Sequence, residues 1–209
     1  MIAIYAAVAV LAIGNWWSRY AGKRVVEYVT KPAVTALVAV GALVATPQST
    51  AMRAWFVVAF VLCLAGDVFL MLRERFFIAG LASFLLGHVA FVVGLLVNGR
   101  GWHVGVGSIA GLLLVAAIAI VAGPRIVAGA QHHDPALTGP VVAYLGVITT
   151  MAVVAALKGN GWAIGGAGAF VVSDALLGWG RFVRAHRHGE VVIMVTYHAA
   201  LVGLLLSLH

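Results

Sequence analysis

Two aspartates lie inside apolar segments that are long enough to cross a membrane. Asp67 follows Leu64-Ala-Gly, and Asp174 follows Val171-Val-Ser, so two of the six acidic residues occupy similar settings. A carboxylate at bilayer depth is costly and is rare unless it faces an interior cavity or a partner. Two interior carboxyls can donate and accept protons, which is the chemistry of acid–base catalysis and of proton relays. The matching settings predict one polar site built from both halves of the chain.

Further polar residues fall in or near the same half of the apolar segments, and we expect them to contribute to this site. They are Asn15, Lys31, His88, Tyr144, Ser173, Tyr197 and His198. Buried polar groups in a bundle usually satisfy one another, so together they predict a pocket open to the cytoplasm or inner leaflet. Structural alternatives exist for each: interhelical hydrogen bonding for the aspartates, an interfacial anchor for the lysine, and packing or local backbone bonding for the rest.

The composition indicates an integral membrane protein. Hydrophobic residues make up 64% of the chain and charged residues 9%, against roughly 25% charged residues in soluble domains. The net charge of +7 does not indicate a nucleic-acid partner, because the basic residues cluster in short loops and no nucleic-acid motif is present. The single Cys63 excludes an intrachain disulfide. We expect one domain, residues 1–209.

Hydropathy predicts an all-α polytopic protein, a bundle of eight transmembrane helices. The predicted spans are Met1–Trp17, Pro32–Thr46, Ala54–Leu72, Phe76–Val97, Val104–Val121, Ala136–Leu157, Trp162–Gly180 and Val191–Leu208. The second span is short, and its start at Pro32 fits the tolerance for proline in a first helical turn. Short connections predict that sequential helices are antiparallel neighbours.

The loop charges predict an orientation in the membrane. Ten basic residues follow the odd-numbered spans: Arg19, Lys23, Arg24, Lys31, Arg73, Arg75, Arg125, Arg181, Arg184 and Arg187. The remaining three, Arg53, Arg100 and Lys158, follow even-numbered spans. The positive-inside bias then places the odd loops and the polar site toward the cytoplasm, and both termini on the other side, as in a bacterial inner membrane.

A weak internal repeat relates the first four spans to the last four. In each half an aspartate is followed by an Arg-rich turn and a His-containing span, with His88 after Asp67 and His198 after Asp174. Four helices separate the two units, so they would run in the same direction, as in a parallel repeat.

Other motifs point to no cofactor or metal. His132-His133-Asp134 is expected to be a solvated loop, and His186-Arg187-His188 a basic cytoplasmic loop. The glycines of residues 161–168 are typical of small-residue helix packing. No P-loop, no Gly-x-Ser-x-Gly elbow and no His-Glu-x-x-His motif occurs.

Short motifs in five of the predicted spans occur in an order typical of one family. They are Lys31-Pro32, Gly66-Asp67 with Leu70-Met71, Phe77-Ile-Ala-Gly80 with Ser83-Phe84 and Gly87-His88, Gly166-Ala-Gly-Ala-Phe170 with Ser173-Asp174 and Leu177, and Thr196-Tyr197. On these residues the chain, from Lys31 to the end of the last span, resembles the YhhN family of lysoplasmalogenase-like membrane proteins.

The resemblance implies eight spans, the same number as hydropathy gives. It also implies hydrolysis of the vinyl ether bond of a lysoplasmalogen to a fatty aldehyde and a glycerophospho-alcohol. The expected partners are therefore a lysophospholipid substrate and membrane lipids. The family often has Tyr-Tyr-Ala-Ala-Gln in its last span, whereas this chain has Tyr197-His198-Ala-Ala-Leu201, so a role of that Gln in orienting substrate does not carry over.

Vinyl ether hydrolysis requires an acid that protonates the β-carbon and an anion that stabilises the oxocarbenium ion or activates water. In a low-dielectric site, burial and mutual repulsion keep one of two carboxyls protonated while the other ionises, as in glycosidases. We therefore predict Asp67 and Asp174 as the catalytic acid/base pair. His88 or His198 would relay protons, and Lys31 would hold the lipid phosphate.

Two other functions remain open. One is a proton-coupled transporter or channel, because intramembrane Asp and His residues also form proton relays. The other is a metal-dependent membrane hydrolase with Zn²⁺ bound by Asp67, Asp174, His88 and His198, a ligand set without a characteristic spacing.

Overall fold

The structure is a computed structural model that describes residues 1–72, 74–185 and 189–209. These ranges contain nine α-helices and two 3₁₀ turns: α1 (Ile2–Tyr20), α2 (Arg24–Val44), α3 (Thr50–Met71), η1 (Glu74–Phe76), α4 (Phe77–Leu96), α5 (Val106–Val121), α6 (Gly123–His133), η2 (Pro135–Leu137), α7 (Thr138–Lys158), α8 (Gly161–Phe182) and α9 (Gly189–Leu206). Within them, eight helical segments are long and apolar enough to cross a membrane, with α5 and α6 forming one. The all-α polytopic fold class is thereby confirmed, whereas the parallel repeat stays a prediction.

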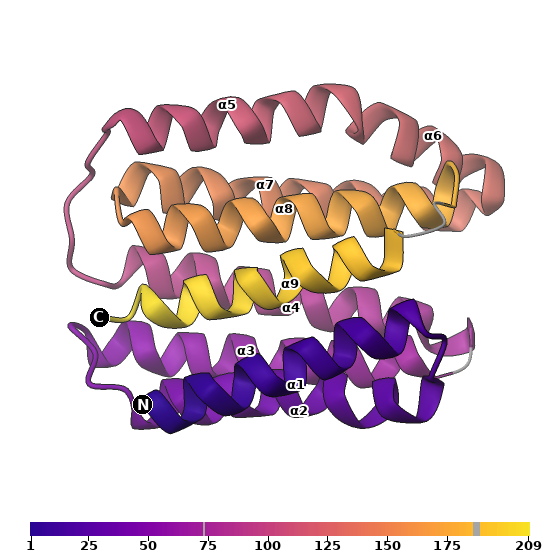
Figure 1. Cartoon of the computed structure of the whole chain (residues 1–209). Helices are drawn as coiled ribbons and strands as arrows, with labels where there is room; N and C mark the ends of the chain where they lie inside the picture. Colours follow the sequence, from indigo (N-terminus) through magenta and orange to yellow (C-terminus); the bar gives the residue numbers. More distant parts are fainter. Residues whose placement is uncertain (73, 186–188) are drawn as a thin grey trace.

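The helices run side by side as one elongated bundle, with both chain ends at the same end (Figure 1). Consecutive helices α1 to α4 pack as neighbours, and α8 packs closely on α9. The expectation of sequential neighbours is wrong at α4, which packs on α3 and α7 while α5 packs on α7 and α8. The connection from Val97 to Gly105 carries the chain across the end of the bundle, and His103 N donates to Leu157 O there (2.7 Å).

Helix α2 begins eight residues before Pro32, so the predicted start of the second span is wrong. Arg24 and Glu27 lower the local hydropathy, but they occupy the first turns of a continuous helix, and Glu27 pairs with Arg19 of α1 at 2.6 Å. Pro32 lies inside α2 and removes one backbone hydrogen bond there. Lys31 consequently lies two turns inside α2, not in a loop or at a helix start.

The predicted loop after the fifth span is also helical over most of its length. Gly123–His133 forms α6, so His132 and His133 lie in its last turn and Arg125 lies within it. Pro124 near the start of α6 suits a first helical turn. Of the other loop residues, Arg73, His186, Arg187 and His188 lie outside the described residues.

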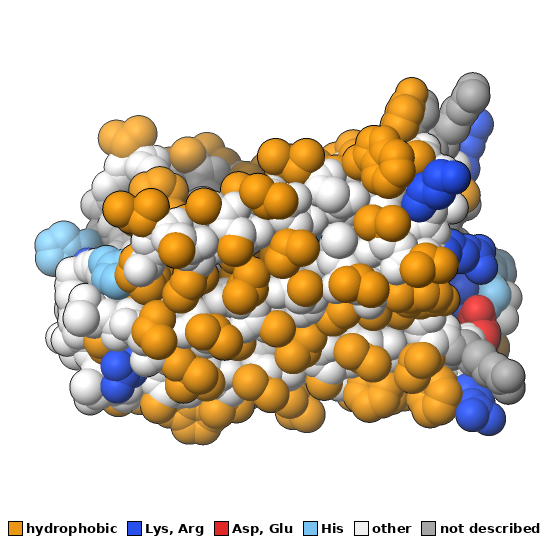
Figure 2. Space-filling model, turned by 60° about the horizontal axis from the view of Figure 1, so that its bottom comes forward, with side chains coloured by type: hydrophobic (Ala, Val, Ile, Leu, Met, Phe, Trp, Pro, Cys, Tyr) orange, Lys and Arg blue, Asp and Glu red, His pale blue; other side chains and the backbone are white. Residues whose placement is uncertain are grey.

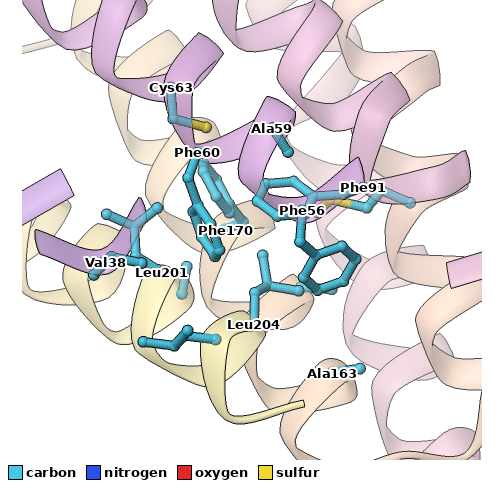
Figure 3. Packing of buried hydrophobic residues seen from close by; sticks show 14 of the residues in the cluster. Val38, Phe56, Ala59, Phe60, Cys63, Phe91, Ala163, Phe170, Leu201 and Leu204 are labelled. Carbon is cyan, nitrogen blue, oxygen red and sulfur yellow. The ribbon is translucent and has the colours of Figure 1, made fainter. Parts of the chain in front are cut away.

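Aromatic side chains form the centre of the core where α3, α4 and α8 meet (Figure 3). Phe91 makes edge-to-face contacts with Phe56 and Phe60 at centroid distances of 5.0 and 5.2 Å, and lies 6.3 Å from Phe170. All four rings are fully buried. Such pairs add roughly 0.5–1.5 kcal/mol each beyond their burial, and they fix the helices that carry the polar residues described below.

The outer surface has the charge distribution expected of a protein in a bilayer. On the face shown in Figure 2, hydrophobic side chains cover the long middle band, while Lys and Arg side chains gather at the ends, chiefly one of them. Exposed large residues such as Val10, Ile13 and Leu43 belong to this apolar surface. Lipid contact explains their exposure, because the hydrocarbon region is as apolar as they are.

Helices α8 and α9 approach closely at Gly166 and Gly203. A Cβ on Gly166 would lie 2.7 Å from Leu204 N and 3.0 Å from Ala200 O. Small residues permit such backbone contact between membrane helices, which confirms the packing role predicted for this glycine. Gly161 and Gly165 instead face open space.

We predict that Gly166→Ala destabilises the protein by about 1–3 kcal/mol, because the added methyl group forces the two backbones apart. Gly165→Ala is the matched control, since its Cβ would meet no atom within 4 Å. Thermal unfolding in detergent should show a lower midpoint for the first variant alone. Equal midpoints would contradict the close-contact interpretation.

Candidate active site

Asp67 lies fully buried near the end of α3 and is surrounded by donors. Thr35 Oγ1 donates to its Oδ2 at 2.6 Å, and Tyr197 OH donates to the same oxygen at 2.8 Å. Lys31 Nζ lies 3.3 Å from Oδ1. A cation and two hydroxyl donors form a set that stabilises a carboxylate anion away from water.

The position of these donors follows from helix periodicity. Lys31 and Thr35 are four residues apart, so both project from the same face of α2, and both are buried. Tyr197 comes from α9, which packs on α2. Residues from three helices therefore meet at one carboxylate.

Asp174, on α8, has a second and separate set of partners. Tyr144 OH of α7 donates to its Oδ2 at 2.5 Å, and His88 Nε2 of α4 lies 3.7 Å from the same oxygen. The Asp174 side chain is 10% exposed, whereas that of Asp67 is 0% exposed. His88 is completely buried, and neither ring nitrogen has a hydrogen-bond partner.

Aromatic rings lie between the two carboxyl clusters. The Phe170 ring is 4.6 Å from His88 on one side and 5.5 Å from Tyr197 on the other, both edge-to-face. Phe84 also contacts Tyr197, at 5.9 Å. The two aspartates predicted to form one site therefore lie in two clusters joined by shared aromatic contacts.

Three of the expected site residues connect helices instead. Asn15 Nδ2 donates to Thr30 Oγ1 at 3.0 Å, and Ser173 Oγ donates to Ile193 O at 3.1 Å. His198 Nδ1 accepts from Trp16 Nε1 at 3.0 Å. These bonds join α1 to α2, α8 to α9 and α1 to α9, so Ser173 does not bond to its own helix.

A narrow pocket of about 50 Å³, here called the central pocket, opens beside Asp174. It is lined by Leu70, Phe77, Leu81, Phe84, Ile126, Val141, Tyr144, Leu145, Asp174, Leu177, Gly178, Arg181 and Phe182. Only Tyr144, Asp174 and Arg181 bring polar groups to this lining.

A second pocket of about 310 Å³, here called the charged pocket, adjoins the first. It is lined by Arg19, Glu27, Lys31, Leu70, Met71, Leu176, Leu177, Gly180, Arg181, Ala185, Gly189, Glu190, Ile193 and Met194. The two pockets share Leu70, Leu177 and Arg181. Asp67 lines neither pocket, but its partner Lys31 lines the charged one.

Sequence reasoning missed Thr35 and the position of Arg181. Thr35 follows Lys31 by one helical turn, and this spacing could have identified it. Arg181 was counted as a loop charge, but it lies in the last turn of α8, two turns after Asp174 and on the same face. It pairs with Glu74 and lies 4.8 Å above the Phe77 ring.

The four residues of the zinc alternative do not converge in the described part of the chain. There, no three His, Cys, Asp or Glu side chains form a group able to hold a metal ion. His88 approaches Asp174, but His198 bonds to Trp16 and Asp67 to Lys31.

The fold and site define a polytopic membrane protein with two buried carboxyl groups in its spans, one of which, Asp174, lines a largely apolar pocket. A YhhN family model matches residues 26–208, and the chain belongs to this family. No solved structure matches it significantly.

Curated relatives carry the name lysoplasmalogenase. The chain is 34% identical over 132 residues to "Lysoplasmalogenase TMEM86B" of Homo sapiens, covering 63% of this chain and 53% of that protein. It is 32% identical over 152 residues to "Lysoplasmalogenase" of Mycobacterium bovis, covering 71% and 58%. A third relative, "Lysoplasmalogenase TMEM86B" of Rattus norvegicus, is 31% identical over 157 residues, covering 73% and 61%. The chain thus spans little more than half the length of these relatives.

We predict that Lys31→Met destabilises the protein by about 3–5 kcal/mol, because it leaves the Asp67 carboxylate buried without its cation. The double variant Lys31→Met/Asp67→Asn should recover most of this loss, since both charges are then removed. Thermal unfolding in detergent measures both effects.

Arg24→Met is the control for this pair, because it removes an exposed cation from the same helix. Its unfolding midpoint should match that of the unsubstituted protein. Additive losses in the double variant would show that Lys31 and Asp67 act independently.

Proposed function

We propose that the protein is a membrane-embedded hydrolase that cleaves the vinyl ether bond of a lysophospholipid. The products are a fatty aldehyde and a glycerophospho-alcohol. One observation carries the proposal: the Asp174 carboxyl lines an apolar pocket that continues to Arg181 and the charged pocket. The family and the names of the relatives support the same reaction.

The spacing along α8 suits this substrate. Asp174 and Arg181 are seven residues apart, which is about 10 Å along a helix. In a lysoplasmalogen, the glycerol unit separates the phosphate from the vinyl ether, and in its extended form it has a comparable length. Arg181, with Arg19 and Lys31 nearby in the charged pocket, would hold the phosphate while the vinyl ether reaches Asp174.

In the proposed reaction, Asp174 transfers a proton to the β-carbon of the vinyl ether. The resulting oxocarbenium ion is stabilised by the Asp174 carboxylate, which Tyr144 keeps in place through its hydrogen bond. Water adds to the cation and returns a proton to Asp174. The hemiacetal then collapses, with its hydroxyl proton passing to the leaving glycerol oxygen, to give aldehyde and alcohol.

Asp67 has a different role in this proposal from that of Asp174. It is fully buried and lines neither pocket, so access to the substrate favours Asp174 as the acid. Asp67 would act as a positioning residue, holding Lys31 and Tyr197 beside the pockets. His88, 3.7 Å from Asp174, is placed to relay protons.

A proton-coupled transporter remains the second candidate. The observation that favours it is the completely buried His88, whose two ring nitrogens lack hydrogen-bond partners beside Asp174. Histidine and aspartate at bilayer depth also form proton pathways. Release of aldehyde from a purified preparation separates the two functions, because a transporter produces none.

We predict that purified protein releases aldehyde from a lysoplasmalogen and that Asp174→Asn lowers the rate by about 10²–10⁴-fold, the usual contribution of a general acid. Tyr144→Phe should lower it about fivefold, since one hydrogen bond contributes about 1 kcal/mol. A coupled dehydrogenase assay measures aldehyde directly.

Asp134→Asn provides the control, because Asp134 is exposed at the end of α6 and lines none of the pockets beside Asp174. It should keep full activity. Full activity of folded Asp174→Asn would exclude the mechanism, and an inert unsubstituted protein would make transport the leading function.

We also propose that the charged pocket faces the cytoplasm, as the loop charges indicate. In a Cys63→Ala background, we predict that a membrane-impermeant maleimide labels Gly101→Cys but not Arg184→Cys in intact cells. Both positions are exposed, and they lie near opposite ends of the bundle. After the membrane is permeabilised, both should react, and the reverse pattern in intact cells would invert the orientation.

A further inference from the structure

A third pocket opens on the other side of Asp174, between α5, α6, α7 and α8. This side pocket has a volume of about 100 Å³, and Asp174 is the one charged residue in its lining. Small residues from three helices make room for it: Ala119, Ala122, Gly123 and Ala175. Ala119 is exposed on the outside of the bundle, so the side pocket borders the surface that lipids cover.

The side pocket and the central pocket meet at Asp174. Both include Ile126, Leu145 and Asp174 in their linings. Ile126 is buried against Gly178, where an added Cβ would lie 3.2 Å from it. The Asp174 carboxyl therefore lies where the two pockets meet. The central pocket extends from it to Arg181, and the side pocket extends between α5 and α7.

We propose that the side pocket receives the hydrocarbon chain of the substrate, and that Gly123 and Ala119 determine how that chain is accepted. This inference rests on the proposed vinyl ether hydrolysis. A vinyl ether has two substituents, a polar glycerophosphate group on its oxygen and an apolar hydrocarbon chain on its β-carbon. When the vinyl ether lies at Asp174, both substituents must extend away from this carboxyl. The central pocket leads to cationic groups, and the side pocket contributes apolar side chains, Gly123 and Thr149 besides Asp174.

Gly123 offers a way to narrow the side pocket without disturbing the fold. It belongs to the pocket lining, and a Cβ at this position would meet no atom within 4 Å, so Gly123→Leu adds bulk at the pocket without a clash. Gly165→Leu is the matched control, because Gly165 also faces open space and lines none of the three pockets. Ala119→Leu is a second filling variant from α5.

The test compares lysoplasmalogens with one head group and alkenyl chains from butenyl to hexadecenyl. Each buried methylene contributes roughly a factor of four in affinity, so excluding even two of them should lower kcat/KM for the hexadecenyl substrate by ~10-fold or more. Gly123→Leu and Ala119→Leu should show this loss, while the butenyl substrate and the Gly165→Leu control remain unaffected. Equal behaviour of all three variants at every chain length would overturn the proposal.

A binding experiment separates this inference from the proposed reaction. The probe is a saturated alkyl-ether lysophosphocholine with a diazirine in its chain, which the protein cannot hydrolyse. Photolabelling of Val115, Ile118 or Ala119, which line the side pocket and not the central one, supports the side pocket, even if the unsubstituted protein releases no aldehyde and the hydrolase proposal fails. Labelling confined to Phe77–Leu96 of α4 would overturn the side pocket and place the chain in the central pocket.

Discussion

A charge at bilayer depth needs a partner that reaches the same depth, and the Asp67–Lys31 ion pair meets this requirement. Lys31 reaches Asp67 because α2 begins two turns earlier, and Thr35 and Tyr197 complete the set of donors. A buried ion pair adds little net stability, but loss of one partner is costly. The pair therefore specifies how α2, α3 and α9 fit together more than it strengthens the bundle, and the pockets depend on that fit.

The aromatic core divides the polar interior into parts with different access. Phe170 contacts His88 on one side and Tyr197 on the other, so the Asp174 and Asp67 clusters share a wall without merging. Asp174 lines the central and side pockets. Asp67 lines no pocket, but its ion-pair partner Lys31 lines the charged pocket. The Asp174 carboxyl is thus placed to contact a ligand, whereas the Asp67 carboxyl is placed to hold Lys31, Thr35 and Tyr197.

Hydropathy predicted eight spans and the two intramembrane aspartates because burial in lipid imposes a strong local pattern. It failed where a helix tolerates charge, so the predicted second span began only at Pro32 and Lys31 was counted among the loop charges. It also failed where contacts are distant in sequence. Nothing local indicates that α4 packs on α7 instead of α5, or that Phe170 lies between the clusters. The pockets follow from this packing, so the sequence predicted the chemical groups of the candidate site but not their grouping.

The weakly embedded position of α5 has a consequence for the surroundings of the protein. Only 11% of the most apolar window of the α5–α6 span is buried within the protein, against 44% for α2, α7 and α9. Since α5 packs on α6, α7 and α8 and most of its surface is not covered by protein, bilayer lipids are expected to contact most of this helix. The thickness and acyl-chain order of the membrane thereby become part of the environment of Asp174, and detergent or a thinner bilayer changes that environment without changing a residue.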